Sequence, residues 1–362
     1  MAVNPVAEPG PARTSRPAGW LEQRTGLGPL ISASLHVRIP MTARTYYFGG
    51  IALFLFGIQV VTGTLLALYY KPTPEAAYKS VQYITSDVSF GWLIRSLHHW
   101  AANLMILFVV LHLARVFVQA AYKFPREITW VVGCVLLMIT IGFGFTGYLL
   151  PWDQRAYWAT VVGTEIAGGV PVVGDVLLQL LRGGADVTGD TMSRFFGIHV
   201  LVLPLSLGAV LAGHLVLVHQ LGLASPKRPE PRVRTPEVEQ EPLRPFFPHY
   251  ILDELVAWYV LLAVLVVLAS VFPAGLEEQA NPLQTPHVKP EWYFLGVYQL
   301  LKLVPIKVIG ILIPIVAVGL LVVWPFLDRS PEVLARRRKL VVGGATLVML
   351  GLVALTVWGY VS

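Results

Sequence analysis

The sequence predicts an all-α, polytopic membrane protein with about seven transmembrane helices, four in one bundle and three in a module that follows. Of the 362 residues, 55% are hydrophobic and only 13% are charged, a composition far too apolar for an ordinary soluble domain. Apolar runs long enough to cross a bilayer also recur along the chain. These predicted spans cover residues 46–70, 95–120, 129–150, 197–221, 250–272, 308–327 and 340–361.

The chain divides into four predicted parts. Residues 1–30 are proline-rich and polar, which predicts a disordered cytoplasmic lead, with a surface helix near Trp20. Residues 31–222 hold the first four spans, and residues 223–248 form a charged linker rich in proline. Residues 249–362 hold the last three spans.

Positive charges gather in three connections, at residues 123–126, 227–244 and 336–339. The positive-inside rule places these connections in the cytoplasm, with the N-terminus inside and the C-terminus outside. We therefore expect a multi-pass protein of a bacterial inner membrane. The net charge of +6 reflects this topology, so nucleic acid is not an expected partner. The single cysteine, Cys134, lies in an apolar run and provides no disulfide framework, CxxCH haem attachment or iron–sulfur ligand set.

Two pairs of histidines stand at nearly equal spacing on two predicted spans. His98 precedes His112 by 14 residues, and His199 precedes His214 by 15. Such steps are close to four helical turns and separate the two rings of a pair by roughly 21–23 Å on one helix face. One such histidine alone is as often a packing residue, but four in matched pairs favour two bis-histidine metal centres. By the predicted topology, His98 and His199 lie toward the outer side and His112 and His214 toward the inner side.

Glycines repeat the same spacing on the other two helices of the bundle. Gly49 and Gly63, and likewise Gly133 and Gly147, are 14 residues apart. Glycine leaves room for a flat macrocycle to approach a helix, although small-residue helix packing is an alternative explanation.

Three arginines flank the histidines at the predicted membrane edges. Arg95, Arg115 and Arg194 lie where a haem propionate would emerge. Arginines that extend to the interface from a membrane helix are the alternative.

Two predicted outer segments carry polar groups among aromatic ones. The third span leads into Tyr148 and a helical connection that ends near Arg182, and residues 290–295 read Pro-Glu-Trp-Tyr-Phe-Leu. A carboxylate in an apolar slot, here Glu291 beside Tyr293, can accept a proton from a bound quinol. An interfacial aromatic belt with one capping glutamate is the alternative.

Several of these segments together resemble cytochrome b of the cytochrome bc complexes, from about Trp20 to the last span. The resemblance rests on the runs Arg95–Trp100, Leu111–Arg115, Gly147–Trp152, Arg194–His199 and Pro290–Leu295. It implies two non-covalent b haems, the outer one held by His98 and His199 and the inner one by His112 and His214. It also implies quinol oxidation at Glu291, Tyr293 and Tyr148. The implied partners are a Rieske iron–sulfur protein, a c-type cytochrome, quinone and a second copy of the complex.

Three details refine the resemblance. The 15-residue step from His199 to His214 and the seven spans are similar to a chloroplast-type cytochrome b fused to its three-helix subunit. That branch carries a covalent third haem on a cysteine where this chain has Tyr47, so no covalent third haem is expected. His219 instead matches the quinone-reduction histidine of the mitochondrial type.

The resemblance therefore implies quinol oxidation outside, quinone reduction near His219 inside, and coupled proton translocation. The alternative is a dihaem membrane anchor that relays electrons between quinone and a soluble dehydrogenase. Such an anchor needs the four histidines but not the Pro-Glu-Trp-Tyr-Phe-Leu segment. A transporter with incidental histidines, the third alternative, would show no haem spectrum.

Overall fold

The computed structural model describes residues 38–40, 47–224, 243–284, 288–304 and 307–362, so the predicted lead 1–30 and most of the predicted linker lie outside the described residues. Within that part, the seven predicted spans are confirmed with slightly different ends. The spans are Tyr47–Ala67, Gly91–Val118, Glu127–Tyr148, Gly189–Leu221, Phe246–Val271, Ile309–Leu327 and Lys339–Val361.

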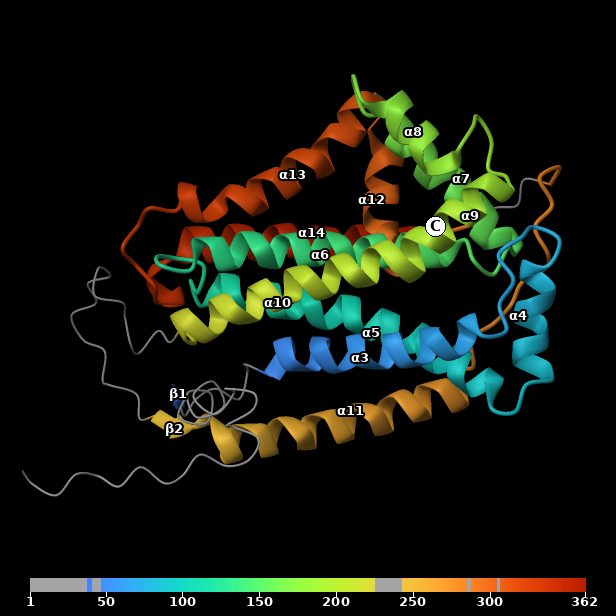
Figure 1. The fold of residues 1–362 in the computed structure, drawn as a ribbon. Helices are drawn as coiled ribbons and strands as arrows, with labels where there is room; N and C mark the ends of the chain where they lie inside the picture. Colours follow the sequence, from blue (N-terminus) through green and yellow to red (C-terminus); the bar gives the residue numbers. More distant parts are fainter. Residues whose placement is uncertain (1–37, 41–46, 225–242, 285–287, 305–306) are drawn as a thin grey trace, which may run out of the picture.

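Four of the spans form the central bundle. Helix α3 (Tyr47–Ala67) packs along α5 (Gly91–Val118), and α6 (Glu127–Tyr148) packs along α10 (Leu203–Leu221). Contacts between α5 and α6 join the two pairs. All four helices run along the same long axis, so their ends define two opposite faces of the molecule (Figure 1).

The three later spans lie on different sides of this bundle. Helix α11 (Ile251–Val271) packs against α3 and α5. Helix α13 (Lys307–Leu327) packs against α6, while α14 (Lys339–Val361) packs against a shorter helix, α12 (Trp292–Leu303). Figure 1 shows α11 on one side of the bundle and α13 and α14 on the other. The segment between α11 and α12 therefore crosses one end of the bundle.

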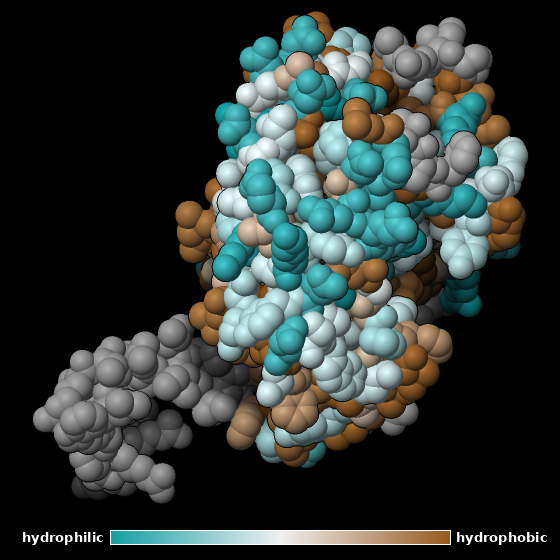
Figure 2. Space-filling model, turned by 90° about the vertical axis from the view of Figure 1, so that its right-hand side faces the viewer, coloured by the Kyte–Doolittle hydropathy of each residue, from teal (hydrophilic) through white to brown (hydrophobic). Residues whose placement is uncertain are grey.

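That end, which we call the loop-rich end, carries four short helices. They are α4 (Ala77–Ser86), α7 (Gln154–Gly168), α8 (Gly174–Arg182) and α9 (Gly189–Gly197). The helical connection that ends at Arg182 was predicted, whereas α4 and α12 were not. Figure 2 looks onto this end and shows hydrophilic side chains over its centre and hydrophobic ones at its rim.

The opposite end holds a small β ribbon that the all-α prediction did not include. Strand β1 (Arg38–Pro40) pairs antiparallel with β2 (Leu243–Pro245), and Ile39 faces Arg244 in the register. A π-helical turn, η3 (Phe246–Tyr250), follows β2 and leads into α11. Two strands of three residues with a proline in each lack the alternating pattern by which strands are recognised.

A buried polar cluster at the opposite end joins the bundle to the turn between α13 and α14. Lys123 Nζ lies 3.2 Å from Asp328 Oδ2, and Tyr122 donates to the same oxygen at 2.5 Å. Arg338 also pairs with Asp328, at 3.3 Å, and donates to the Tyr122 hydroxyl. Because the side chains of both cations and of Asp328 are at least 93% buried, each charge depends on this pairing.

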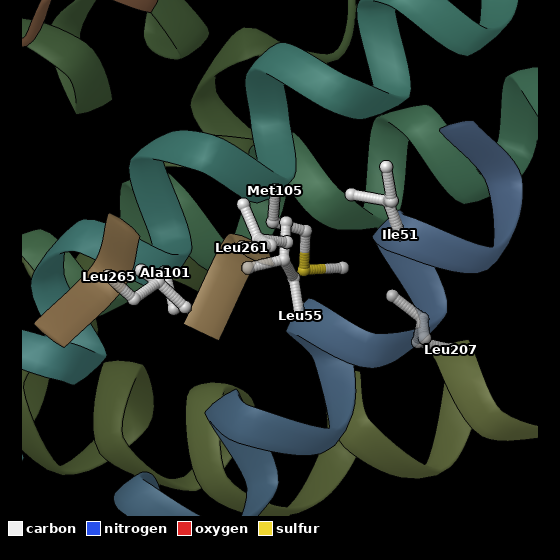
Figure 3. Close-up of a cluster of buried hydrophobic side chains, with 7 residues drawn as sticks. All are labelled: Ile51, Leu55, Ala101, Met105, Leu207, Leu261 and Leu265. Carbon is white, nitrogen blue, oxygen red and sulfur yellow. The ribbon is translucent and has the colours of Figure 1, made fainter. Parts of the chain in front are cut away.

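The middle of the bundle is closed by apolar side chains from four helices (Figure 3). Leu55, Ala101 and Leu265 are fully buried there, together with Met105 and Leu207. The cluster includes Ala101 and Met105, which lie between His98 and His112 on α5. It therefore separates the two ends of the bundle with an apolar layer.

Candidate functional site

The structure brings His98 and His199 together near the loop-rich end. Their ring centroids are 6.4 Å apart, with an angle of 67° between the ring planes. With a nitrogen–metal bond of about 2 Å on each side, two imidazoles that share one ion have ring centres roughly 6–6.5 Å apart. The separation therefore fits one metal ion between the two rings.

Two threonines orient these rings. Thr62 Oγ1 lies 2.9 Å from His98 Nδ1, and Thr146 Oγ1 lies 3.1 Å from His199 Nδ1. Each hydroxyl donates its own proton to a helix carbonyl, that of Ile58 or Gly142. Each therefore accepts a hydrogen bond from Nδ1–H, which leaves the lone pair of Nε2 for a metal.

Sequence analysis missed both threonines, although a signal for them was present. Thr62 and Thr146 each stand one residue before a glycine of the predicted set, Gly63 or Gly147. Phe48 and Val132 take the equivalent places before Gly49 and Gly133. The two histidine pairs thus differ in the groups beside their rings.

All four predicted glycines face the predicted histidines. A Cβ atom added at Gly147 would lie 2.6 Å from Cε1 of His199. The corresponding distances are 3.1 Å from Gly63 to His98, 3.2 Å from Gly49 to His112 and 3.5 Å from Gly133 to His214. The space that each glycine leaves is therefore taken by the edge of an imidazole.

A π-helical turn, η2 (Ile198–Val202), contains His199 and explains the unequal histidine steps. It lies between α9 and α10, immediately before Leu203 and Pro204. A π turn accommodates one more residue than an α turn. The 15-residue step from His199 to His214 is therefore equivalent to the 14-residue step on α5.

The second pair, His112 and His214, lies nearer the opposite end of the same helices. The two imidazoles interact electrostatically with each other, and Arg115 acts on His112. A groove of about 320 Å³ beside His112 is lined by Phe48, Leu111, Ala114, Arg115, Val118 and Gln119. The predicted residue Arg115 therefore lines a groove next to this pair.

The other two predicted arginines hold connections at the loop-rich end. Arg95 donates to the carbonyls of Ala274 and Gly275 at 2.7 and 2.5 Å, and so ties α5 to the segment after α11. Arg194 donates to the carbonyl of Leu180 at 3.1 Å. Both arginines therefore donate hydrogen bonds to backbone carbonyls.

The predicted carboxylate, Glu291, lies at the start of α12 on the loop-rich end. It occupies the N-cap position, but its side chain makes no capping hydrogen bond. Burial raises the pKa of its carboxyl group, and the charge of Arg155 opposes this effect. The alternative of a glutamate that only caps a helix is therefore not supported by its contacts.

Tyr148 and Tyr293 lie with Glu291. The ring of Tyr293 packs against α6, where a Cβ atom added at Gly144 would lie 3.1 Å from its Cε2 atom. Burial and the Glu291 charge raise the pKa of the Tyr293 hydroxyl. The buried hydroxyl of Tyr148 has no hydrogen-bond partner among the described residues, and Glu291 acts on it electrostatically. The three predicted residues thus form one cluster of polar groups among aromatic rings.

Tyr47 and His219 lie at the opposite end. The Tyr47 hydroxyl donates to Asp253 Oδ2 at 3.1 Å and accepts from Arg244 at 3.1 Å. His219 is exposed on the last turn of α10, five residues beyond His214. His219 is the more exposed of the two.

The bundle, its two histidine pairs and the partly buried carboxylate define a membrane-embedded electron-transfer protein. Residues 34–222 match the family model described as cytochrome b/b6/petB, and residues 279–362 match the model for cytochrome b (C-terminal)/b6/petD. The chain therefore belongs to the cytochrome b/b6 family. As the cytochrome b of a bc-type complex, it is a multi-pass membrane protein of electron transport that binds haem b.

Two relatives and one solved structure are similar to this chain. A cytochrome bc complex cytochrome b subunit from Chlorobaculum thiosulfatiphilum is 42% identical over 82% of this chain and 69% of its own length. Cytochrome b6 from Heliobacterium mobile is 49% identical over 57% of this chain and 99% of its own length. A solved structure of a hyperthermophilic respiratory Complex III matches with a TM-score of 0.82 and 34% identity, over 94% of this chain and 90% of the matched one.

Proposed function

We propose that this chain oxidises quinol at the loop-rich end and bifurcates the two electrons. One electron goes to a Rieske iron–sulfur partner and the other to a quinone-reduction site at the opposite end, with proton translocation. The observation that carries this proposal is the cluster of Glu291, Tyr293 and Tyr148, at the same end of the bundle as His98 and His199. A simple electron relay has no need of a partly buried carboxylate there.

We assign His98 and His199 as axial ligands of one b haem, and His112 and His214 as ligands of the second. The Nδ1 bonds from His98 and His199 to threonine hydroxyls support this assignment, since they leave Nε2 for iron. When bound, the two haems supply one-electron carriers whose potentials the axial imidazoles and nearby charges tune. We propose no covalent third haem at Tyr47, because its side chain has no thiol that could form a thioether bond to a haem.

In the proposed reaction, Glu291 accepts a proton from the bound quinol. A base must lie within hydrogen-bond reach of the proton it takes and have a pKa not far from the working pH. Burial moves the pKa of Glu291 upward in that direction. The Tyr148 hydroxyl offers a second polar group to the quinol head, and the Tyr293 ring forms an apolar wall.

At the opposite end, we propose that quinone is reduced near His219, which takes up protons from the cytoplasm. The exposed position of His219 supports access from that side. The basic turns at this end support a cytoplasmic orientation, and the loop-rich end then faces outward. We expect the chain to lie in a bacterial inner membrane, within a homodimeric complex that includes a Rieske protein and a c-type cytochrome.

Addition of quinol to the purified, oxidised complex tests this function. We expect reduction of b-type haem together with reduction of the c-type cytochrome, in equal amounts during the first turnover. Reduction of b haem alone would favour the dihaem anchor, and the absence of b-type bands would contradict both redox functions. His98→Leu should remove one haem, while His99→Leu should remove none, because the ring of His99 packs on Trp100 and lies beside Asn103.

A further inference from the structure

A charge pair beside the cluster of Glu291, Tyr293 and Tyr148 is not part of the predicted site. Arg155, in the first turn of α7, forms an ion pair with Glu277 in the segment between α11 and α12. Its guanidinium group is half exposed, and it also interacts electrostatically with Glu291 and Tyr148. Arg155 is therefore a cation with two carboxylate neighbours of different burial.

Backbone contacts fix this pair in place. Asp153 and Gln279 form an isolated antiparallel bridge, in which Gln154 N donates to Glu278 O at 2.9 Å. Ala280 N donates to Trp152 O at 3.0 Å on the other side of the bridge. The Asp153 side chain caps α7 through Ala156 N and accepts from Glu277 N. The segment that carries Glu277 is thus held against the turn that carries Arg155.

The start of α12 packs against the same region. Phe294 contacts Phe145 of α6 at 6.2 Å between ring centroids, and Gln154 donates to Gln284 at 3.4 Å. The charged and titratable groups that face Glu291 or Arg155 come from four elements. They are His99, Tyr148, Glu277 and Tyr293.

We propose that Arg155 is a positioning residue for quinol oxidation, which shares its charge between Glu277 and Glu291 and so keeps Glu291 ready to accept a proton. The proposal rests on the proposed role of Glu291 as the base. A carboxylate in an apolar pocket is protonated too readily to remain a base near neutral pH, and a nearby cation counteracts this. Glu277 limits the effect, because it neutralises part of the same charge.

The two partners therefore have opposite effects on Glu291. Arg155→Met removes the cation, so the Glu291 carboxylate takes up its proton at a higher pH. Glu277→Gln leaves Arg155 without its ion-pair partner, so Glu291 ionises at a lower pH. Arg155→Lys keeps the charge and should restore the behaviour of the unmodified complex.

The experiment is the pH dependence of quinol oxidation by the purified complex, together with an infrared titration of the protonated Glu291 carboxyl. The infrared band is assigned by its loss in Glu291→Gln. For Arg155→Met we expect the rising limb of the rate profile and the infrared midpoint to move upward by about 0.5–1 pH unit, a small shift because Arg155 is half exposed. Glu277→Gln should move both downward.

Arg337→Met is the matched control. Arg337 pairs with Glu332 at 3.7 Å, with side-chain exposures of 39% and 34%, on the turn before α14. That variant should shift neither midpoint. Unshifted midpoints in Arg155→Met, or shifts of the same sign in Arg155→Met and Glu277→Gln, would overturn the proposal. If the unmodified complex did not oxidise quinol at all, the proposed function would fail instead, and the infrared titration would still test the Arg155 effect.

Discussion

Thr62 Oγ1 lies 2.9 Å from Nδ1 of His98, while the same hydroxyl donates to the carbonyl of Ile58 at 2.6 Å. One small side chain therefore fixes the tautomer and the orientation of a proposed axial ligand. Thr146 does the same for His199, from another helix of the bundle. The protein itself thus fixes the orientation of both rings of this pair, and this makes the pair suited to rigid ligation.

The first prediction concerns Thr62→Val, which removes the hydroxyl and keeps the branched shape. We expect haem affinity at the His98 and His199 site to fall ~10–100-fold, the usual effect of losing a group that orients a ligand. Haem titration of the purified protein measures this. Thr140→Val is the control, because buried Thr140 bonds to the Leu136 carbonyl in the same way. Equal losses in both variants would contradict an orienting role.

The second prediction compares two glycines. In Gly147→Ala, the new methyl group would lie 2.6 Å from His199 and must displace the ring, at a cost of about 1–3 kcal/mol. In Gly133→Ala, the methyl group would lie at an ordinary contact distance of 3.5 Å from His214. Difference spectra should show loss of one haem in Gly147→Ala and retention of both in Gly133→Ala. Retention of both haems in each variant would mean that the glycines serve only helix packing.

The third prediction concerns the proposed base. Glu291→Gln keeps the shape of the side chain and removes its ability to accept a proton, so quinol oxidation should slow by ~10²–10⁴-fold. Both haems should remain bound and reducible by dithionite. The control is Glu278→Gln, an exposed carboxylate in the same connection, which should keep normal turnover. Unchanged turnover in Glu291→Gln would refute the proton role.

The fourth prediction concerns the buried cluster at the opposite end. Asp328→Asn leaves Lys123 and Arg338 buried without their carboxylate, and we expect a loss of about 3–5 kcal/mol in stability. Thermal unfolding of the complex measures this loss. Glu332→Gln disrupts only the half-exposed pair with Arg337 and should cost less than about 1 kcal/mol. Equal losses of stability in the two variants would mean that burial does not strengthen the ion pairs of Asp328.

The same cluster has a pH dependence of defined sign. Burial opposes ionisation of Asp328, but hydrogen bonds from Tyr122 and Ser330 and the charge of Lys123 outweigh it and lower its pKa. Ionised Asp328 therefore stabilises the fold above the ordinary aspartate pKa, and this contribution is lost as the pH falls through the lowered value. Acid unfolding of Asp328→Asn should consequently depend less on pH below about 4 than that of the unmodified complex.

The seven spans could be predicted because long apolar segments have few alternatives to a membrane helix. The spacing of His98 and His112 was equally readable, since both lie on one regular α-helix. For His199 and His214 the sequence showed a step of 15 residues but not the reason for it. No sequence pattern predicts the π-helical turn at His199 that accommodates the additional residue.

Other features depend on segments that are distant in the sequence. The ion pair between Arg155 and Glu277 forms only because the segment between α11 and α12 crosses the loop-rich end and the Asp153–Gln279 bridge joins the two connections. Neither residue lies in a local sequence pattern that predicts this ion pair. Helix α12 was missed because its 12 residues are too few for a span and follow a loop rich in proline.

The apolar layer around Leu55, Met105 and Leu265 has an electrical consequence. The 14 residues between His98 and His112 correspond to roughly 21 Å along the helix axis, or about two thirds of a 30 Å hydrocarbon core. An electron that passes between the proposed sites crosses that share of the membrane voltage, in a medium that cannot screen its charge. At about 2.3 kcal/mol per charge for each 100 mV, the step stores or consumes about 1.5 kcal/mol per 100 mV. The apolar layer thus makes electron transfer within the chain sensitive to the voltage across the membrane.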